Sequence, residues 1–433
     1  MIVRETVHKL PLFSGVFFGN CTYFDIETTG LSPQRSHLCT LGIADRENDT
    51  LRLRQWVPEK PAEEADVLQA AAPFLQKAGT LVHFNGSSFD LPYLQKRCAL
   101  YDLPDPFEGV KQLDLYRELR PFRGIFAAEH MRQKDLEAWL GIPRKDQLSG
   151  KDVISRYRRY LETGETACIE QVLLHNAEDV LHLARLQQLL VYPALCRGEF
   201  ALERWEVQTV VPAPVSVSGA AADESQNYAH SFQESHTEGS PSDSAEKVSG
   251  PGTSSATEMP SLPLAAEDIC SFDPDSAVDV SAPLSHTGHR ILTFHLYMDI
   301  PLPKPLQLTE WPYSLEGEGH TIRLQIQGRS GELRHFFSPW KDYYYFPEED
   351  QAYHKSVAMF ADPAHRKKAT AATCYQRRQG LFFPQPTALL TPVFYETDSK
   401  GTPWFPAAAV DTAGTDLLQK YVCEILCRIL RTR

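Results

Sequence analysis

The chain has 433 residues, of which 42% are hydrophobic and 23% are charged. This length exceeds that of a usual single domain, and the apolar content suffices for a sizeable core. No stretch reaches the roughly 18 consecutive apolar residues of a membrane helix, so we expect no membrane span. The formal net charge of −13 is unevenly distributed: residues 213–287 hold 12 Asp and Glu against one Lys, whereas residues 288–433 carry a net charge of +2.

Cysteine usage and the N-terminus favour a cytoplasmic protein. The nine cysteines are scattered, odd in number and without a C-x-x-C pair, so they are typical of reduced thiols and not of a zinc site or a disulfide framework. The apolar run at residues 10–18 is a candidate signal-peptide core. However, Pro11 and Gly15 interrupt it, and Glu5 lies in the segment that would have to be basic.

In chain order, the sequence predicts a β-meander, then alternating helices and strands, then a helical stretch. The predicted strands cover residues 21–27, 38–45, 50–57, 80–84 and 110–115, and the predicted helices cover residues 62–77, 89–101, 132–140, 149–161 and 165–190. A meander followed by alternating elements is typical of an α/β fold whose sheet mixes parallel and antiparallel strands.

A polar middle segment divides the chain into two predicted domains. Residues 206–287 are rich in Ser, Ala, Gly, Pro and acidic residues and lack lasting apolar periodicity, so we expect a disordered linker. The N-terminal domain then covers residues 1–205. The C-terminal domain covers residues 288–433 and is predicted to be α+β, with strands at 290–298 and 321–327 and an amphipathic helix at 415–430.

The first motif, D-x-E-T-T-G, runs from Asp25 to Gly30 at the end of the first predicted strand. Because strand side chains alternate between faces, Asp25 and Glu27 point to the same side. Two carboxylates so close together repel each other unless cations lie between them, which suggests a metal site. A polar strand end that leads into a turn is the other interpretation of this motif on its own.

The second motif, N-G-x-x-F-D, runs from Asn85 to Asp90, where a short apolar strand leads into a helix. Open α/β sheets bind their ligands at the carboxyl ends of strands, so Asp90 is a candidate for the same site. Considered alone, Asp90 would more commonly be a helix-capping residue.

The third motif, H-N-x-x-D, runs from His175 to Asp179 inside the last long helix of the N-terminal domain. Residues four apart share one face of a helix, so this imidazole and this carboxylate can face one cleft. A lone helical histidine is usually structural, and the spacing to Asp179 is what favours a functional site.

The three motifs at these spacings resemble the DEDD exonucleases, the superfamily of polymerase proofreading domains, over about residues 20–190. The closer resemblance is to the bacterial YprB-type RNase H-like domains, where the stretch equivalent to Leu140–Gly150 is also similar. The resemblance implies an RNase H-like mixed sheet flanked by helices. It assigns the general base to His175 and the four metal-binding carboxylates to Asp25, Glu27, Asp90 and Asp179.

This resemblance implies a 3′→5′ exonuclease that hydrolyses phosphodiester bonds at single-stranded DNA or RNA ends. Four oxygen ligands favour Mg²⁺ or Mn²⁺ over zinc, and two such ions roughly 4 Å apart would clamp the attacking water and the leaving oxygen. Asn85 and Phe89 would contact the terminal nucleotide, although Phe89 is equally well explained as a core residue. Three residues separate His175 from Asp179, whereas the subclass with a histidine base usually has four.

Two alternatives stay open at this point: a nucleic-acid-binding scaffold with little or no turnover, and an endonuclease that uses the same metal site. The C-terminal domain has no recognisable family. Aromatic and basic residues interleave in its segments 340–346, 354–356, 366–368 and 377–378. This pattern suits a surface that stacks on bases and binds phosphates, and equally a β-rich core with a solvated basic rim.

Overall fold

The structure, a computed structural model, describes residues 1–9, 20–210 and 289–431. The predicted linker at residues 206–287 lies outside the described residues except for 206–210, and so does the apolar run at residues 10–18. Within the described ranges, no helix combines the length and the apolar character that crossing a membrane requires.

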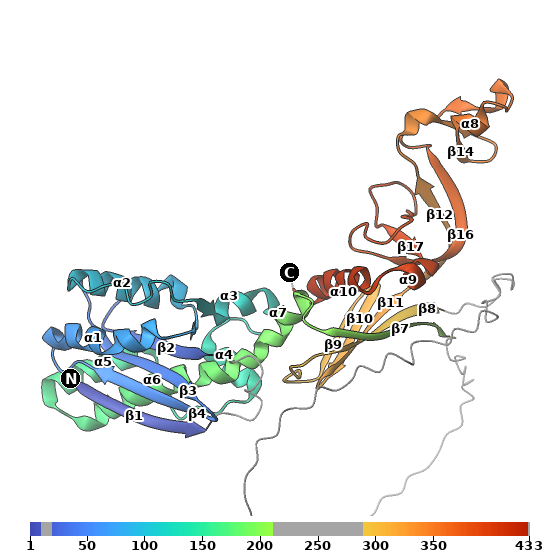
Figure 1. Cartoon of the computed structure of the whole chain (residues 1–433). Coiled ribbons are helices and arrows are strands. Elements are labelled where there is room, and N and C mark those ends of the chain that lie inside the picture. Colours follow the sequence, from blue (N-terminus) through green and yellow to red (C-terminus); the bar gives the residue numbers. More distant parts are fainter. Residues whose placement is uncertain (10–19, 211–288, 432–433) are drawn as a thin grey trace, which may run out of the picture. The chain divides into compact units, whose positions relative to one another are not determined.

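A six-stranded mixed sheet forms the centre of the N-terminal part (Figure 1). The predicted meander is confirmed: β2, β3 and β4 pair antiparallel in sequence order, and β5 and β6 continue the sheet parallel to β2. The edge strand β1, which the sequence analysis missed, pairs antiparallel with β4. The six strands are β1 (Ile2–Lys9), β2 (Cys21–Thr28), β3 (Leu38–Glu47), β4 (Thr50–Val57), β5 (Thr80–His83) and β6 (Gln112–Asp114).

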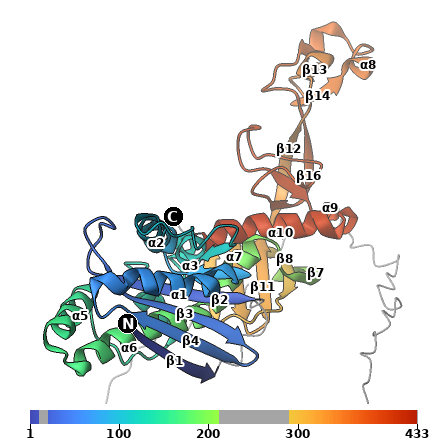
Figure 2. The same ribbon diagram turned by 60° about the vertical axis from the view of Figure 1, so that its left-hand side comes forward.

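Helices flank this sheet, so the predicted α/β class is confirmed. The helices are α1 (Glu64–Gln76), α2 (Asp90–Leu100), α3 (Leu115–Leu119), α4 (Gln133–Leu140), α5 (Gly150–Thr163), α6 (Thr166–Leu186) and α7 (Val191–Cys196). The neighbours α5 and α6 lie side by side (Figure 2). The short helices α3 and α7 were not predicted, because five or six residues are too few to show helical periodicity.

The alternation of β2 decides which way its acidic residues point. Phe24 and Ile26 are buried in an apolar cluster with residues of α1 and α2. Tyr23 faces the other side, where its hydroxyl donates a 2.7 Å hydrogen bond to Gln187, just beyond α6. Asp25 and Glu27 continue the Tyr23 series and therefore face α6, as strand periodicity requires.

The C-terminal part is built on a five-stranded antiparallel sheet in the order β7-β8-β11-β10-β9. Its strands are β7 (Ala201–Val210), β8 (His289–Tyr297), β9 (Leu306–Glu310), β10 (Tyr313–Glu318) and β11 (Thr321–Gln327). The predicted boundary at residue 205 falls inside β7, which pairs with β8. As an edge strand with largely exposed side chains, β7 lacks the apolar alternation that would reveal it in the sequence.

A β-ribbon, a small inserted sheet and three helices complete the described C-terminal part, which confirms its predicted α+β class. The remaining elements are β12 (Arg329–Phe336), β13 (Tyr343–Phe346), β14 (Gln351–His354), α8 (Lys355–Ala358), β15 (Lys367–Lys368), β16 (Tyr375–Pro384), β17 (Trp404–Pro406), α9 (Ala408–Thr412) and α10 (Thr415–Leu430). Residues 337–374 are inserted at the end of the ribbon that β12 forms with β16. Here Tyr343 stacks on Phe337, and Phe346 is buried. Much of the aromatic segment 340–346 therefore builds a small core.

The C-terminal helix α10 packs on α7. The Sγ atom of Cys423 donates to the backbone oxygen of Cys196 at 2.7 Å, and Gln419 donates to the backbone oxygen of Gly198 at 2.7 Å. Leu195 of α7 and Leu426 of α10 are fully buried in the same apolar cluster. Helix α7 therefore belongs as much to the C-terminal core as to the N-terminal domain.

Candidate functional site

Strand β2 and helix α6 bring three of the predicted residues into direct contact. The Nε2 atom of His175 lies 3.1 Å from Oε1 of Glu27 and 3.3 Å from Oδ2 of Asp179. Glu27, His175 and Asp179 each offer one ligand atom, and these atoms lie within 4.8 Å of one another. A single ion could be held by this trio.

Asp25 and Asp90 extend the trio to four carboxylates. Asp90 is the first residue of α2, and the backbone groups of Asp90 itself and of Ile26 partly offset the effect of burial on the pKa of its carboxylate. Burial, together with the charges of Asp179, Glu27 and Asp90, raises the pKa of Asp25 well above its usual range. Burial also raises the pKa of Asp90 to about 7, with Glu27 adding to the effect. The four carboxylates therefore repel one another in a partly buried cluster.

A buried amide fixes the orientation of Asp25. The Nδ2 group of Asn176 donates to the carboxylate of Asp25 at 3.0 Å and to its backbone oxygen at 3.2 Å. The Oδ1 atom of Asn176 accepts a 2.8 Å hydrogen bond from Gln55. A Cβ atom at Gly42 of β3 would lie 2.2 Å from this Oδ1, so only glycine lets α6 approach the sheet here. Asn176 thus links α6, β4 and the carboxylate of Asp25.

The loop between α4 and α5 supplies two more residues, Arg144 and Asp146. The nearly buried carboxylate of Asp146 lies 2.8 Å from Nδ1 of His175, opposite the nitrogen that faces the carboxylates. Arg144 donates to Asp179 at 2.6 Å and to Glu137 at 2.9 Å. Burial lowers the pKa of His175, but the hydrogen bond to Glu27 and the charges of Asp179, Glu27 and Asp146 raise it further, so the net shift is upward.

Sequence reasoning did not assign roles to Arg144, Asp146, Asn176, Gln55 or Gly42. A signal existed for three of them: Arg144 and Asp146 lie in the segment that resembles YprB-type domains, and Asn176 lies inside the third motif. The partners of Gln55 and Gly42 come from elements more than 100 residues away. Their contribution becomes visible only in three dimensions.

Asn85 and Phe89, the predicted substrate contacts, differ in their surroundings. Asn85 has a left-handed backbone with φ 59°, and its N–H donates a 2.9 Å hydrogen bond to Asp114, which also caps α3. The residue lines two surface cavities. Phe89 packs against Tyr93 with ring centroids 5.4 Å apart and borders the cluster under α1 and α2, so a core role accounts for part of its surface.

The residues present fit a divalent cation. Carboxylate oxygens are hard ligands of the kind that Mg²⁺ and Mn²⁺ prefer. Burial first, and neighbouring carboxylates after it, raise the pKa values of Asp25, Asp90 and Asp179, so their ionised forms are unfavourable without a counter-charge. Arg144 offsets part of the negative charge at Asp179, and a bound cation would offset the rest.

Residues 22–191 match a family model described as RNase_H superfamily. This part of the chain is therefore an RNase H-like region. The matched range contains all four carboxylates and His175, and it ends at the first residue of α7. No curated protein matches the chain. The more specific resemblance to YprB-type domains stays a prediction.

Three solved structures are similar to part of this chain. A family B DNA polymerase from the hyperthermophilic archaeon Pyrobaculum calidifontis is 17% identical, with a TM-score of 0.33, over 44% of this chain and 32% of the polymerase. Brucella melitensis NrnC bound to pGG is 21% identical, with a TM-score of 0.28, over 41% of this chain and 75% of NrnC. Exonuclease I from Methylocaldum szegediense is 12% identical, with a TM-score of 0.25, over 46% and 49%. These TM-scores are low, and nothing about the reaction of this chain follows from them.

We expect Asn176→Ala to weaken Mn²⁺ binding by about 10-fold to 100-fold, the usual effect of losing a residue that orients a metal ligand. Gly42→Ala should have a similar effect, because its methyl group would displace Asn176. Titration calorimetry with Mn²⁺ measures both variants. Gly150→Ala is the matched control, since a Cβ at Gly150 meets no atom within 4 Å. Unchanged Mn²⁺ affinity in both test variants would show that Asn176 does not orient Asp25.

The burial of these carboxylates, together with their mutual repulsion, also predicts how stability depends on pH without metal. The pKa of Asp90 is raised in the folded chain, so the folded state binds more protons than the unfolded state between the two pKa values. In EDTA, the free energy of unfolding should therefore fall as the pH rises from about 4 to about 7. Asp90→Asn should reduce this slope, and so should Mg²⁺. Thermal melting across this range measures it, and an equal slope in the variant and the parent chain would contradict the explanation.

Proposed function

We propose that the RNase H-like region is a metal-dependent 3′→5′ exonuclease that hydrolyses single-stranded DNA or RNA from its 3′ end. The observation that carries the proposal is the arrangement around His175. One ring nitrogen faces Glu27 and Asp179, and the other is held by the buried carboxylate of Asp146. The arrangement brings carboxylates that could bind a cation next to an imidazole that a hydrogen bond orients.

The four carboxylates are proposed to hold two divalent ions, Mg²⁺ or Mn²⁺. Such ions supply Lewis-acid activation of the attacking water and neutralise the charge that develops on the leaving 3′ oxygen. The protein supplies rigid ligands for them: Asp25 is fixed by Asn176, and Asp179 is fixed by Arg144. Preorganised ligands of this kind lose little energy to rearrangement when the substrate arrives.

His175 is proposed to accept the proton of the attacking water at Nε2. For this, Nδ1 must carry the hydrogen, and its 2.8 Å contact with Asp146 favours that tautomer. After proton transfer, the imidazolium would lie 3.1 Å from Glu27 and 3.3 Å from Asp179, where their charges stabilise it. Asp146 therefore acts as a positioning residue for the base, as the buried aspartate does in hydrolytic triads.

Asn85 and Phe89 remain the proposed contacts to the terminal nucleotide. The cavity positions of Asn85 support hydrogen bonding to a sugar or base. The ring of Phe89 is half-buried against Tyr93, which leaves one side for stacking. A cytoplasmic location, inferred from the cysteine pattern, is part of the same proposal.

The proposal predicts stepwise, Mg²⁺-dependent or Mn²⁺-dependent loss of nucleotides from the 3′ end of a single-stranded oligonucleotide labelled at its 5′ end. A circular single strand should resist. Asp25→Asn and Asp90→Asn should each abolish this activity while the chain stays folded, because each removes a charge from the site and little volume. Asp66→Asn is the matched control, since Asp66 is exposed in the first turn of α1.

Other outcomes of this assay separate the alternatives. Cleavage of the circular strand would identify an endonuclease. Binding of the linear strand in EDTA, without turnover under any metal condition, would identify a nucleic-acid-binding scaffold. Retained cleavage in either aspartate variant with a normal melting temperature would overturn the two-ion assignment.

His175→Ala should lower kcat by about 10²-fold to 10⁴-fold, the usual contribution of a positioned general base. Mn²⁺ should still bind, because the four carboxylates remain. Asp146→Asn should lower kcat in the same direction by disturbing the tautomer of His175. The control is His8→Ala in the edge strand β1, which β4 and β3 separate from β2. Near-normal kcat in His175→Ala would mean that another group or a water relay removes the proton.

A further inference from the structure

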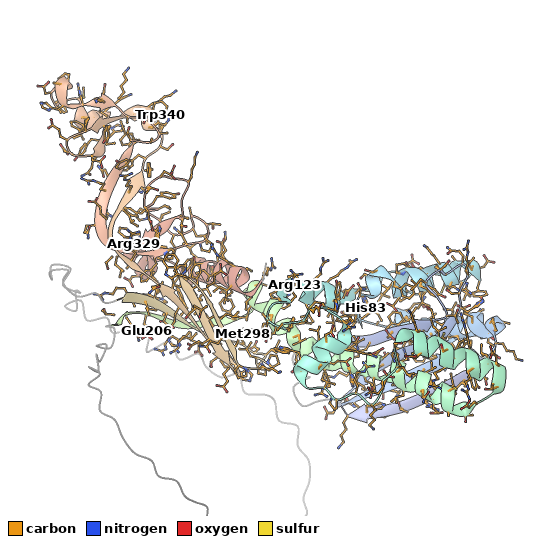
Figure 3. The ribbon with its side chains drawn as sticks, turned by 180° about the vertical axis from the view of Figure 1, so that it is seen from behind. His83, Arg123, Glu206, Met298, Arg329 and Trp340 are labelled. Carbon is orange, nitrogen blue, oxygen red and sulfur yellow. The ribbon has the colours of Figure 1, made fainter. Side chains whose placement is uncertain are left out.

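A groove lined by arginines lies next to the candidate site. It consists of two neighbouring cavities of about 590 and 620 Å³, which share Asn85, Tyr116, Arg120 and Arg123 in their walls. Arg132 lines the first cavity and Arg117 the second. We call this feature the arginine groove. Figure 3 marks Arg123, which lies on the segment that links α3 to α4.

The positive charge of the arginine groove is only partly compensated. Arg132 pairs with Asp135 at 3.0 Å, and Arg117 lies 3.7 Å from Asp114. Among the residues that the structure describes, the exposed side chains of Arg120 and Arg123 form no ion pair or hydrogen bond. Glu129 is the one acidic residue that lines either cavity. The guanidinium groups of Arg120 and Arg123 can therefore bind an anionic ligand.

Contacts within the protein connect the arginine groove to the carboxylate site. Gln133, which lines the first cavity, donates a 2.8 Å hydrogen bond to the backbone oxygen of Asp179. Asn85 lies on the turn that leads from β5 into α2, whose first residue is Asp90. One residue of the groove thus contacts Asp179 directly, and another lies on the segment that leads to Asp90.

Aromatic rings accompany the arginines. Phe84 and Tyr116 pack edge to face with centroids 5.8 Å apart, and both are only partly buried. Both line the first cavity. Exposed aromatic rings beside guanidinium groups provide base stacking and phosphate binding together, which is the combination that single strands require.

We propose that the arginine groove binds the phosphodiester backbone of the single strand on the 5′ side of the scissile phosphate, with Arg120 and Arg123 as the principal phosphate contacts. This inference rests on the proposed function. A 3′→5′ exonuclease releases what lies 3′ of the scissile bond, so an extended groove beside the site must hold the 5′ side. The preferred substrate is accordingly an oligonucleotide several residues long, either DNA or RNA, rather than a dinucleotide.

The test compares the full chain with the double variant Arg120→Ala/Arg123→Ala. Fluorescence anisotropy in EDTA measures binding of labelled single-stranded 12-mers of DNA and of RNA without hydrolysis. Each phosphate contact to a single strand contributes about 0.7 to the slope of log affinity against log salt, so the double variant should lose about 1.4. Arg120→Lys/Arg123→Lys should keep most of the slope because it keeps the charge. Arg158→Ala, an exposed arginine of α5, is the matched control.

With Mg²⁺ present, KM for the 12-mers should rise at least about tenfold in the double variant, and kcat at saturation should change much less. Equal salt slopes in the parent chain and the double variant would overturn the groove assignment, as would absence of binding by the parent chain at low salt. Should Arg120→Ala/Arg123→Ala fail to fold, the same comparison is made with Arg120→Gln/Arg123→Gln. A parent chain that binds with the expected slope but never cleaves would refute the exonuclease and leave the groove standing.

Discussion

Electrostatic repulsion among four carboxylates is the constraint around which the N-terminal domain is organised. Asp25, Glu27, Asp90 and Asp179 come from β2, α2 and α6 and meet in a pocket where burial makes their charges unfavourable. The surrounding protein relieves this repulsion only in part, through Arg144 at Asp179 and Asn176 at Asp25. In the proposed function, bound cations would offset the charge that the protein leaves uncompensated.

The same constraint explains the packing around the site. Helix α6 must approach the sheet closely enough for Asn176 to reach Asp25, and the missing side chain at Gly42 permits that approach. The chain between α4 and α5 must return to α6 so that Arg144 and Asp146 reach Asp179 and His175. The backbone N–H groups of Lys145 and Asp146 donate to Glu178 and hold that return in place. These contacts fix the orientation of the proposed metal ligands.

Much of this site could be predicted from local sequence, because most of its candidate residues lie on regular strands and helices. The two-residue period of a strand places Asp25 and Glu27 on one face, and the helical period places His175 and Asp179 on one face. Both placements agree with the contacts of Asn176 and His175.

By contrast, Gln55 and Gly42 interact with a residue more than 100 positions away, and no local period reveals such a pair. The arginine groove was missed for a related reason, since its arginines lie on the short helix α3 and on the segment that links α3 to α4. In the C-terminal part, β7 was missed because an exposed edge strand has little apolar alternation.

We propose that these four carboxylates hold two divalent cations. Anomalous scattering from crystals grown with Mn²⁺ would locate such ions directly. We expect two peaks in the anomalous difference map, about 3.5 to 4 Å apart. They should lie among the carboxylates of Asp25, Glu27, Asp90 and Asp179 and near Nε2 of His175. Crystals of Asp25→Asn should lose at least one peak. Saturating Mn²⁺ that gives no peak at these carboxylates, or a single ion held by residues elsewhere, would contradict the account.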